Sequence, residues 1–169
     1  MISPHYVSLM ARYNLWQNRW IYASADTLPD AQRRQNGGAF FGSLHTTLAH
    51  ILWGDRVWMN RFAKTPPAAP EDHQGRGEAY ADWTKLKSER AAFDQQISSW
   101  ASSVTKPWLA SDFTWSNIAG TRTATMPAWK LVTHFFNHQT HHRGQAHALL
   151  TKLGATTEDT DLFLIPRQP

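Results

Sequence analysis

The sequence predicts an all-α protein, a four-helix bundle with a short hairpin or ordered loop before its last long helix. Three observations support this prediction. Four long segments carry apolar residues at steps of three and four, the period of an amphipathic helix. Stretches rich in proline and glycine, which interrupt helices, separate these segments. The chain has 169 residues, 41% of them hydrophobic, which suits a single domain over residues 1–169 with one core.

The first two helices are expected over residues 4–25 and 43–62. Pro4 suits the first turn of the earlier helix, where a backbone N–H is not needed. The triplet L-P-D at 28–30 ends that helix, and the loop after it contains Gly37 and Gly38 and reaches Phe41. Ser43 is the candidate N-cap of the second helix, because its hydroxyl can accept a hydrogen bond from the first turn.

The other two long helices are expected over residues 78–102 and 127–153, and Gly154 is the expected stop of the last one. The stretch 64–77 carries three prolines and two glycines, which predicts a loop. Its length permits a topology other than a simple meander. In residues 112–125, Thr, Phe and Trp alternate with other residues around N-I-A-G, and this alternation predicts the hairpin or ordered loop. The apolar tail D-L-F-L-I-P at 161–166 is expected to pack back on the bundle.

The composition limits the classes of function. There are no cysteines, which excludes disulfides, thiolate metal sites and cysteine nucleophiles. No apolar run approaches the length of a membrane span, and the start M-I-S-P-H-Y lacks the features of a secretory signal. We therefore expect a cytoplasmic protein with no membrane partner. The net charge of +4 is spread over scattered lysines and arginines, the densest cluster being Arg33–Arg34, so we expect no nucleic-acid partner.

Histidines are concentrated near the end of the chain. Five of the nine lie within fourteen residues, in the run H-F-F-N-H-Q-T-H-H-R-G-Q-A-H at 134–147. Histidine is the commonest metal ligand among side chains, and residues four apart lie on one face of a helix. Two pairs have this spacing, His134/His138 and His138/His142. Either pair supplies two nitrogens to one divalent ion, so a third ligand must come from elsewhere in the fold.

The second helix offers two candidates for that third ligand, His45 and His50. His50 is flanked by Ile51 and Leu52, which places it near the buried face of its helix. A lone histidine in such a place is more often part of the core than a metal ligand. The histidines spaced four apart on the last helix favour the ligand role for His50. His5 and His73 lie near a terminus and in a loop and are poorer candidates.

Two motifs together resemble a known family. F-F-G-S-L-H-T-T-L-A-H-I-L-W-G-D-R-V-W-M-N-R-F at 40–62 and H-F-F-N-H-Q-T-H-H-R-G-Q at 134–145 are similar to the DinB/YfiT-like family, and Y-N-L-W-Q-N-R at 13–19 fits the first helix of that family. The resemblance covers nearly the whole chain. It implies a four-helix bundle in which three histidines bind one divalent metal. Carried over position by position, these are His50, His138 and His142.

The expected function is that of a metal-dependent enzyme, because three imidazoles leave a coordination position open. The resemblance implies a thiol-linked role, since some relatives are thiol S-transferases or thiol-dependent isomerases, so a low-molecular-weight thiol is a candidate partner. A hydrolase is the nearest variant, although H-E-x-x-H is absent: Gln139 and Phe135 follow His138 and His134. The alternative is a non-catalytic metal-binding stress-response protein. Zinc or nickel is expected first, with iron and manganese also acceptable to imidazole.

The sequence leaves the roles of several residues near the predicted site open. Asp55, one turn beyond His50, could support the site, but a solvated helix carboxylate is the preferred interpretation. His141 points about 100° away from its neighbour on the helix and is expected to make a hydrogen bond or face the mouth of the site. His134 is expected to line the pocket or pack in the core. Arg143 and Gln145 could bind an acidic substrate, orient a ligand or make helix contacts.

Two further expectations concern packing. Gly144 inside a helix costs roughly 1 kcal/mol relative to alanine, which suggests the close approach of another backbone. A homodimer is expected because the first and third helices carry more aromatic surface than one small core needs, and large exposed apolar patches mark interfaces. The tryptophans behind this expectation are Trp16, Trp20, Trp83 and Trp100.

Overall fold

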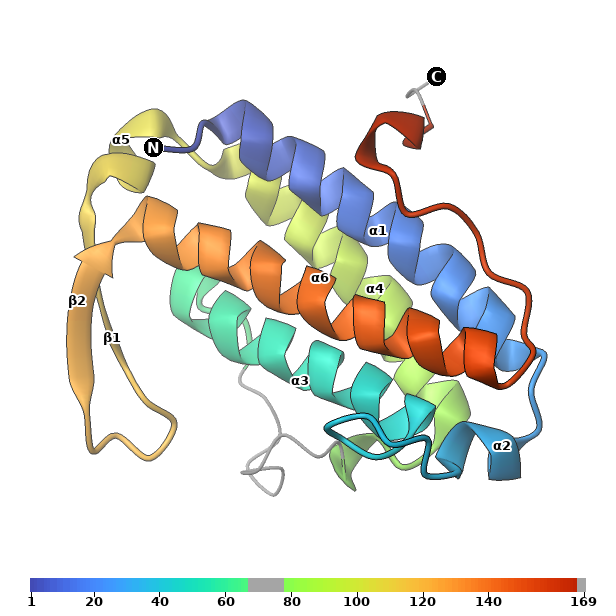
Figure 1. Cartoon of the computed structure of the whole chain (residues 1–169). Coiled ribbons are helices and arrows are strands. Elements are labelled where there is room, and N and C mark those ends of the chain that lie inside the picture. The colour runs from blue at the N-terminus through green and yellow to red at the C-terminus, as the bar shows by residue number, and fades with distance from the viewer. Residues whose placement is uncertain (67–77, 167–169) are drawn as a thin grey trace.

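The computed structural model of the chain describes residues 1–66 and 78–166. Four long helices dominate it, as predicted: α1 (Pro4–Asp26), α3 (Leu44–Ala63), α4 (Trp83–Ser103) and α6 (Ala128–Lys152) (Figure 1). In the part of the chain that the structure describes, the protein is all-α apart from one small sheet. Among the described residues, no helix has the length and apolar character needed to cross a membrane.

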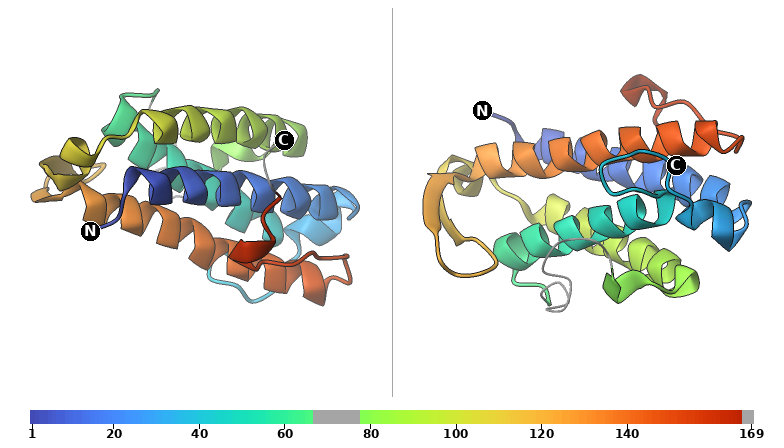
Figure 2. Two further views of the ribbon diagram at one scale, coloured as in Figure 1. Left: turned by 90° about the horizontal axis from the view of Figure 1, so that it is seen from above. Right: turned by 60° about the horizontal axis from the view of Figure 1, so that its bottom comes forward.

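The bundle is built from two antiparallel helix pairs. α1 packs mainly against α4, and α3 packs mainly against α6. α1 and α6 run in one direction and α3 and α4 in the other, so the chain does not follow a meander (Figure 1, Figure 2). The long connection between α3 and α4 permits this arrangement. Residues 64–66 of the predicted loop are without helix or strand, and residues 67–77 lie outside the described residues.

The helix ends follow the predicted signals. Ser3 caps α1 by accepting from the backbone N–H of Tyr6 at 3.2 Å, with Pro4 in the first turn. Ser43 caps α3, as predicted, and exchanges hydrogen bonds with Thr46 in a capping box. After α6 the chain reverses at Gly154, whose φ of 76° is a conformation that glycine adopts readily.

Two short helices are present that the apolar pattern of the sequence does not predict. α2 (Asp30–Arg34) occupies part of the region predicted as loop after Pro29, and α5 (Lys106–Ala110) follows α4. α2 is held by Arg33, whose guanidinium donates to the carbonyls of Ala25 and Leu28 at the end of α1. Arg34 pairs with Asp30 at 2.7 Å. The densest basic cluster of the sequence is therefore engaged in contacts within the chain, with Arg33 only 8% exposed.

The third long helix begins five residues later than predicted. Residues Glu78–Tyr80 form a 3-10 turn, η1, and α4 starts at Trp83. Asp82 fixes this start, because its carboxylate accepts from the backbone N–H of Lys85 at 2.6 Å. A second 3-10 turn, η2 (Leu162–Leu164), lies in the C-terminal tail.

The predicted hairpin is present. β1 (Asp112–Ser116) pairs antiparallel with β2 (Thr123–Pro127), with Thr114 opposite Thr125. It stands beside the end of α3 and the start of α6 (Figure 1). Trp115 on β1 contacts Trp58 of α3, with ring centroids 5.5 Å apart. The hairpin therefore adds a wall to the α3–α6 pair.

The core between the helices is one cluster of buried apolar side chains drawn from all four long helices. Trp20, Trp83 and Trp100 belong to it and are at most 9% exposed. The aromatic side chains from which we expected a homodimer are therefore largely buried within the chain. The dimer itself stays a prediction.

The C-terminal tail returns along α1, but its apolar side chains do not bury as expected. Tyr13 donates to the carbonyl of Thr160 at 2.6 Å, and Gln17 donates to that of Asp159 at 3.1 Å. Phe163 remains 82% exposed. The tail is attached through its backbone carbonyls, a contact that the hydrophobic pattern does not signal.

Candidate metal centre

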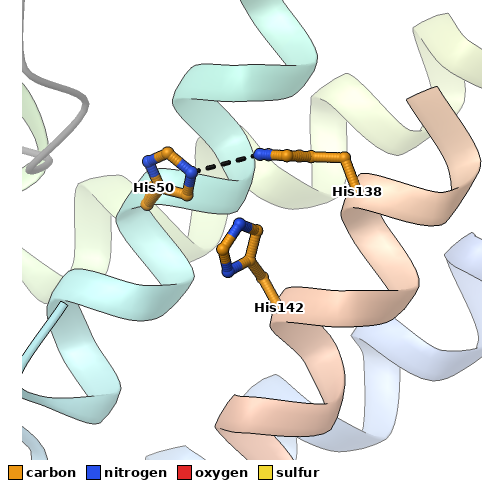
Figure 3. Close-up of side chains that lie close together, drawn as sticks. All are labelled: His50, His138 and His142. Atoms are coloured by element: carbon orange, nitrogen blue, oxygen red, sulfur yellow. Dashed lines mark hydrogen bonds between the residues drawn. The ribbon is translucent and has the colours of Figure 1, made fainter. Parts of the chain in front are cut away.

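His50 of α3 and His138 and His142 of α6 come together between these two helices (Figure 3). One ring nitrogen from each lies within 4.8 Å of the others. The Nε2 atoms of His50 and His138 are 3.1 Å apart. The predicted convergence of these three residues is confirmed. Of the two pairs that the spacing left open, the structure joins His138/His142 to His50.

The other histidine candidates take different roles. His45 points away, and its Nε2 lies 2.8 Å from the carbonyl oxygen of Tyr80. His134 is one turn before His138 and its ring lies against Trp58, at 5.1 Å between centroids. Neither belongs to the group that could hold an ion.

A glycine on α3 makes room for His138. A Cβ atom at Gly54 would lie 2.6 Å from Cε1 of His138, closer than non-bonded carbon atoms approach. The imidazole therefore lies directly on the helix backbone one turn after His50. The predicted close approach at Gly144 was wrong, because a Cβ there would meet nothing within 4 Å. Gly54 lies among the apolar residues of α3, and the sequence does not show which helix will face it.

Gln145 orients His142. Its Oε1 lies 2.8 Å from Nδ1 of His142, and because an amide oxygen only accepts, Nδ1 carries the proton. The lone pair of His142 is then on Nε2. Gln145 also contacts Nε2 of His141 at 3.3 Å, which accords with the hydrogen-bonding role expected for that residue. Orientation of a metal-binding imidazole by an outer hydrogen bond is a general feature of metal sites.

Two aromatic rings cover His50. Phe41 is stacked on its imidazole with centroids 3.8 Å apart, and Trp53 lies nearly parallel to it at 5.5 Å. Phe41 also reaches His142, at 5.4 Å. In the sequence Phe41 is only the end of a predicted loop, because nothing in the pattern shows that this loop folds over α6.

Burial favours the neutral, metal-binding form of the imidazoles of His138 and His142. It lowers the pKa of His138 to about 3, with the neighbouring His142 and His50 adding to the effect. The pKa of His142 is lowered as well, again mainly by burial. The donor set therefore fits a divalent ion. Nitrogens around a tetrahedral zinc lie roughly 3.3 Å apart for bonds of 2.0–2.1 Å, near the 3.1 Å that separates His50 and His138 here.

Comparison with known proteins agrees with the motifs in the sequence. The model of the DinB family matches residues 1–168. The chain belongs to the DinB family. No curated protein and no solved structure gives a significant match.

A buried polar network lies behind the three histidines of this DinB-family protein. Asp55 is fully buried, so its interpretation as a solvated carboxylate was wrong. Its carboxylate pairs with Arg90 of α4 at 2.6 Å and accepts from Gln139 of α6 at 2.9 Å. Burial raises the pKa of Asp55 to about 6, which leaves it ionised at neutral pH. Asp55 and Gln139 directly follow Gly54 and His138, so they fix α3 against α6 at the level of the site.

Arg143 extends this network to α1. It is 4% exposed and donates to Oδ1 of Asn14, and its guanidinium lies 5.4 Å from the ring centre of Tyr13. Asn14 in turn donates to Asp94 of α4 at 3.0 Å. Of the roles considered for Arg143, the structure supports helix contacts and not the binding of a substrate.

A cleft of about 680 Å³ adjoins the histidines in the DinB-family protein. It lies between α3, α6 and the hairpin, and both His134 and His138 line it, as expected for His134. Its other lining residues are Trp53, Gly54, Val57, Trp58, Arg61, Trp115, Asn117, Ile118 and Ala119. The cleft is therefore largely apolar, with one histidine of the candidate metal group at its edge.

Proposed function

We propose that this DinB-family protein is a metal-dependent enzyme that holds one divalent ion, zinc or nickel first, through His50, His138 and His142. The observation that carries the proposal is the convergence of three nitrogens within 4.8 Å beside a cleft large enough for a small molecule. Membership of the DinB family is compatible with this activity. An ion bound by three imidazoles keeps an open position, at which it lowers the pKa of a bound water or thiol.

The surrounding residues supply orientation and shielding. Gln145 keeps the proton of His142 on Nδ1, so that Nε2 can bind. Gly54 lets His138 approach the backbone of α3. Phe41 and Trp53 cover His50 and exclude water from it. These residues hold the donors ready before an ion arrives, which favours binding because little rearrangement is required.

Thiol transfer is the reaction class that we favour. Among the described residues that line the cleft there is no aspartate or glutamate, and Gln139 is turned to Asp55. These residues therefore offer no carboxylate base to a hydrolase. In the proposed transfer, the sulfur of a low-molecular-weight thiol forms a bond to an electrophilic carbon. The leaving group departs with the bonding electrons of that carbon, and the thiol proton passes to solvent.

The stacking of Phe41 on His50 favours one other candidate, a metal-binding protein without catalysis. A covered ligand is also what a structural metal site would show. The two candidates predict the same metal content and differ in turnover.

The test measures metal content and turnover together. Purified protein loaded with zinc or nickel is expected to retain one ion per chain, and His142→Ala is expected to lose it. His5→Ala, a change at an exposed histidine on α1, is the control that should retain it. Equal retention by wild type and His142→Ala would contradict the site. Retention without turnover in panels of thiols and electrophiles would leave the non-catalytic candidate.

A further inference from the structure

Arg61 is a cation built into the wall of the cleft. Its guanidinium lies 4.6 Å from the ring centre of Trp58 and 4.7 Å from that of Trp115, so two indoles from α3 and β1 hold it in place. Its Nη2 donates to the carbonyl of Ser116 at 3.0 Å. These contacts fix a side chain that otherwise has many rotamers.

The charge of Arg61 has no carboxylate beside it in the described part of the chain. Arg56, on the same helix, pairs with Glu89 at 2.7 Å. Burial lowers the pKa of Arg61, which shows that its surroundings do not compensate for lost solvent. A half-buried, immobilised cation without a counter-charge favours the entry of an anion.

We propose that Arg61 binds the carboxylate of a flat, apolar, singly charged substrate, whose other end the cleft directs to His138. This inference rests on the proposed function. Trp58, Trp115 and Ile118 offer apolar surface for the body of such a molecule. Gly54 faces His138, and Arg61 lies seven residues after Gly54 on α3. About 10 Å of helix therefore separates Arg61 from the level of His138. A molecule of two fused rings, with its carboxylate hydrogen-bonded to Arg61, extends over most of that distance.

The charge of the cleft selects a carboxylate over a phosphate. Within residues 1–66 and 78–166, Arg61 is the only lysine or arginine that lines the cleft. One guanidinium balances a carboxylate, and its planar fork matches the two oxygens. A phosphate ester with two charges would leave one unbalanced.

The test compares three probes of the same shape: 2-naphthoate, its neutral amide, and 2-naphthyl phosphate. Binding is measured by calorimetry to metal-free and to zinc-loaded protein. The carboxylate is expected to bind at least about tenfold more tightly than the amide without metal, as a charge-assisted hydrogen bond implies. Arg61→Gln should lose this preference and Arg61→Lys should retain part of it. Arg19→Gln, which removes an exposed arginine of α1, should retain all of it.

Three results would overturn the assignment: equal binding of carboxylate and amide, an unchanged preference in Arg61→Gln, or tighter binding of the phosphate. Absence of binding by all three probes would overturn it as well. Circular dichroism of each variant shows whether the helices are intact, and Arg61→Lys serves if Arg61→Gln does not fold. The metal-free measurement separates this inference from the proposed function, which fails instead if zinc does not bind to the histidines.

Discussion

The contact between Gly54 and His138 gives the sharpest test of the metal site. In Gly54→Ala, the new Cβ would lie 2.6 Å from Cε1 of His138, so the ring must retreat by about 0.8 Å to reach the 3.4 Å of an ordinary contact. Metal–ligand distances tolerate only about 0.2 Å. We therefore expect zinc to bind at least about tenfold more weakly, the lower end of the loss seen when the support of a ligand is removed.

The same change should not weaken the metal-free fold through the helix itself. Alanine is favoured over glycine inside a helix by roughly 1 kcal/mol, which offsets part of the crowding. At a zinc concentration of a hundred times the wild-type dissociation constant, zinc stabilises the wild type by about 2.7 kcal/mol. A tenfold weaker site retains about 1.4 kcal/mol of this. For a chain of this size the difference is roughly 3–5 °C in the zinc-induced shift of Tm.

The assay is thermal melting with chelator and with zinc, together with calorimetric titration of zinc. Gly144→Ala is the matched control, because it makes the same change on α6 two residues after His142 and meets nothing within 4 Å. It should raise the metal-free Tm and leave zinc affinity unchanged. If Gly54→Ala binds zinc as tightly as Gly144→Ala, His138 does not bind the ion from a position against Gly54 of α3.

Three more outcomes follow from the structure. Gln145→Leu removes the acceptor for Nδ1 of His142 and should weaken zinc binding about 10- to 100-fold in a chelator competition assay, with the helical content unchanged. Arg90→Met leaves two buried carboxylates without their cation and should lower the free energy of unfolding in urea by about 3–5 kcal/mol, whereas Arg56→Met, which breaks a partly exposed pair, should cost about 1 kcal/mol or less. Because burial lowers the pKa of His138 to about 3, the unfolded chain binds the extra proton first, so the contribution of His138 to metal-free stability should fall as pH drops from about 6.5 toward 3. Melting curves of wild type and His138→Leu isolate this contribution, because Asp55, whose raised pKa acts in the opposite direction, is present in both.

The long helices and their caps could be predicted from the sequence because their signals are local. The three- and four-residue apolar steps, Ser43 and Gly154 each act within a few residues of the boundary they set. The short helices α2 and α5 escaped because five residues contain little periodicity. α2 depends on Arg33 contacting the end of α1, and a contact of that kind is visible only in the folded chain.

The candidate site divides in the same way. The spacing of the histidines on α6 reduced the choices to two pairs, and the family motifs selected the pair and its partner His50. The supporting residues could not be predicted, because they depend on which faces of α3 and α6 meet. Asp55 is a polar residue among the apolar residues of α3. Its burial depends on its contacts with Arg90 and Gln139, which only the folded chain reveals. Phe41 likewise acquires its place over His50 from the path of a loop.

The pairing of α3 with α6 has a consequence for how the protein acquires its metal. His50 and His138 are 88 positions apart, and the chain between them contains α4, α5 and the hairpin. During synthesis the donor set is incomplete until residue 142 of 169 has been added. An ion cannot template the early folding steps of such a chain. Metal binding instead follows the completion of the bundle. A product truncated before α6 keeps only one of the three histidines, His50, and is expected to bind a metal ion no more tightly than an ordinary surface imidazole does.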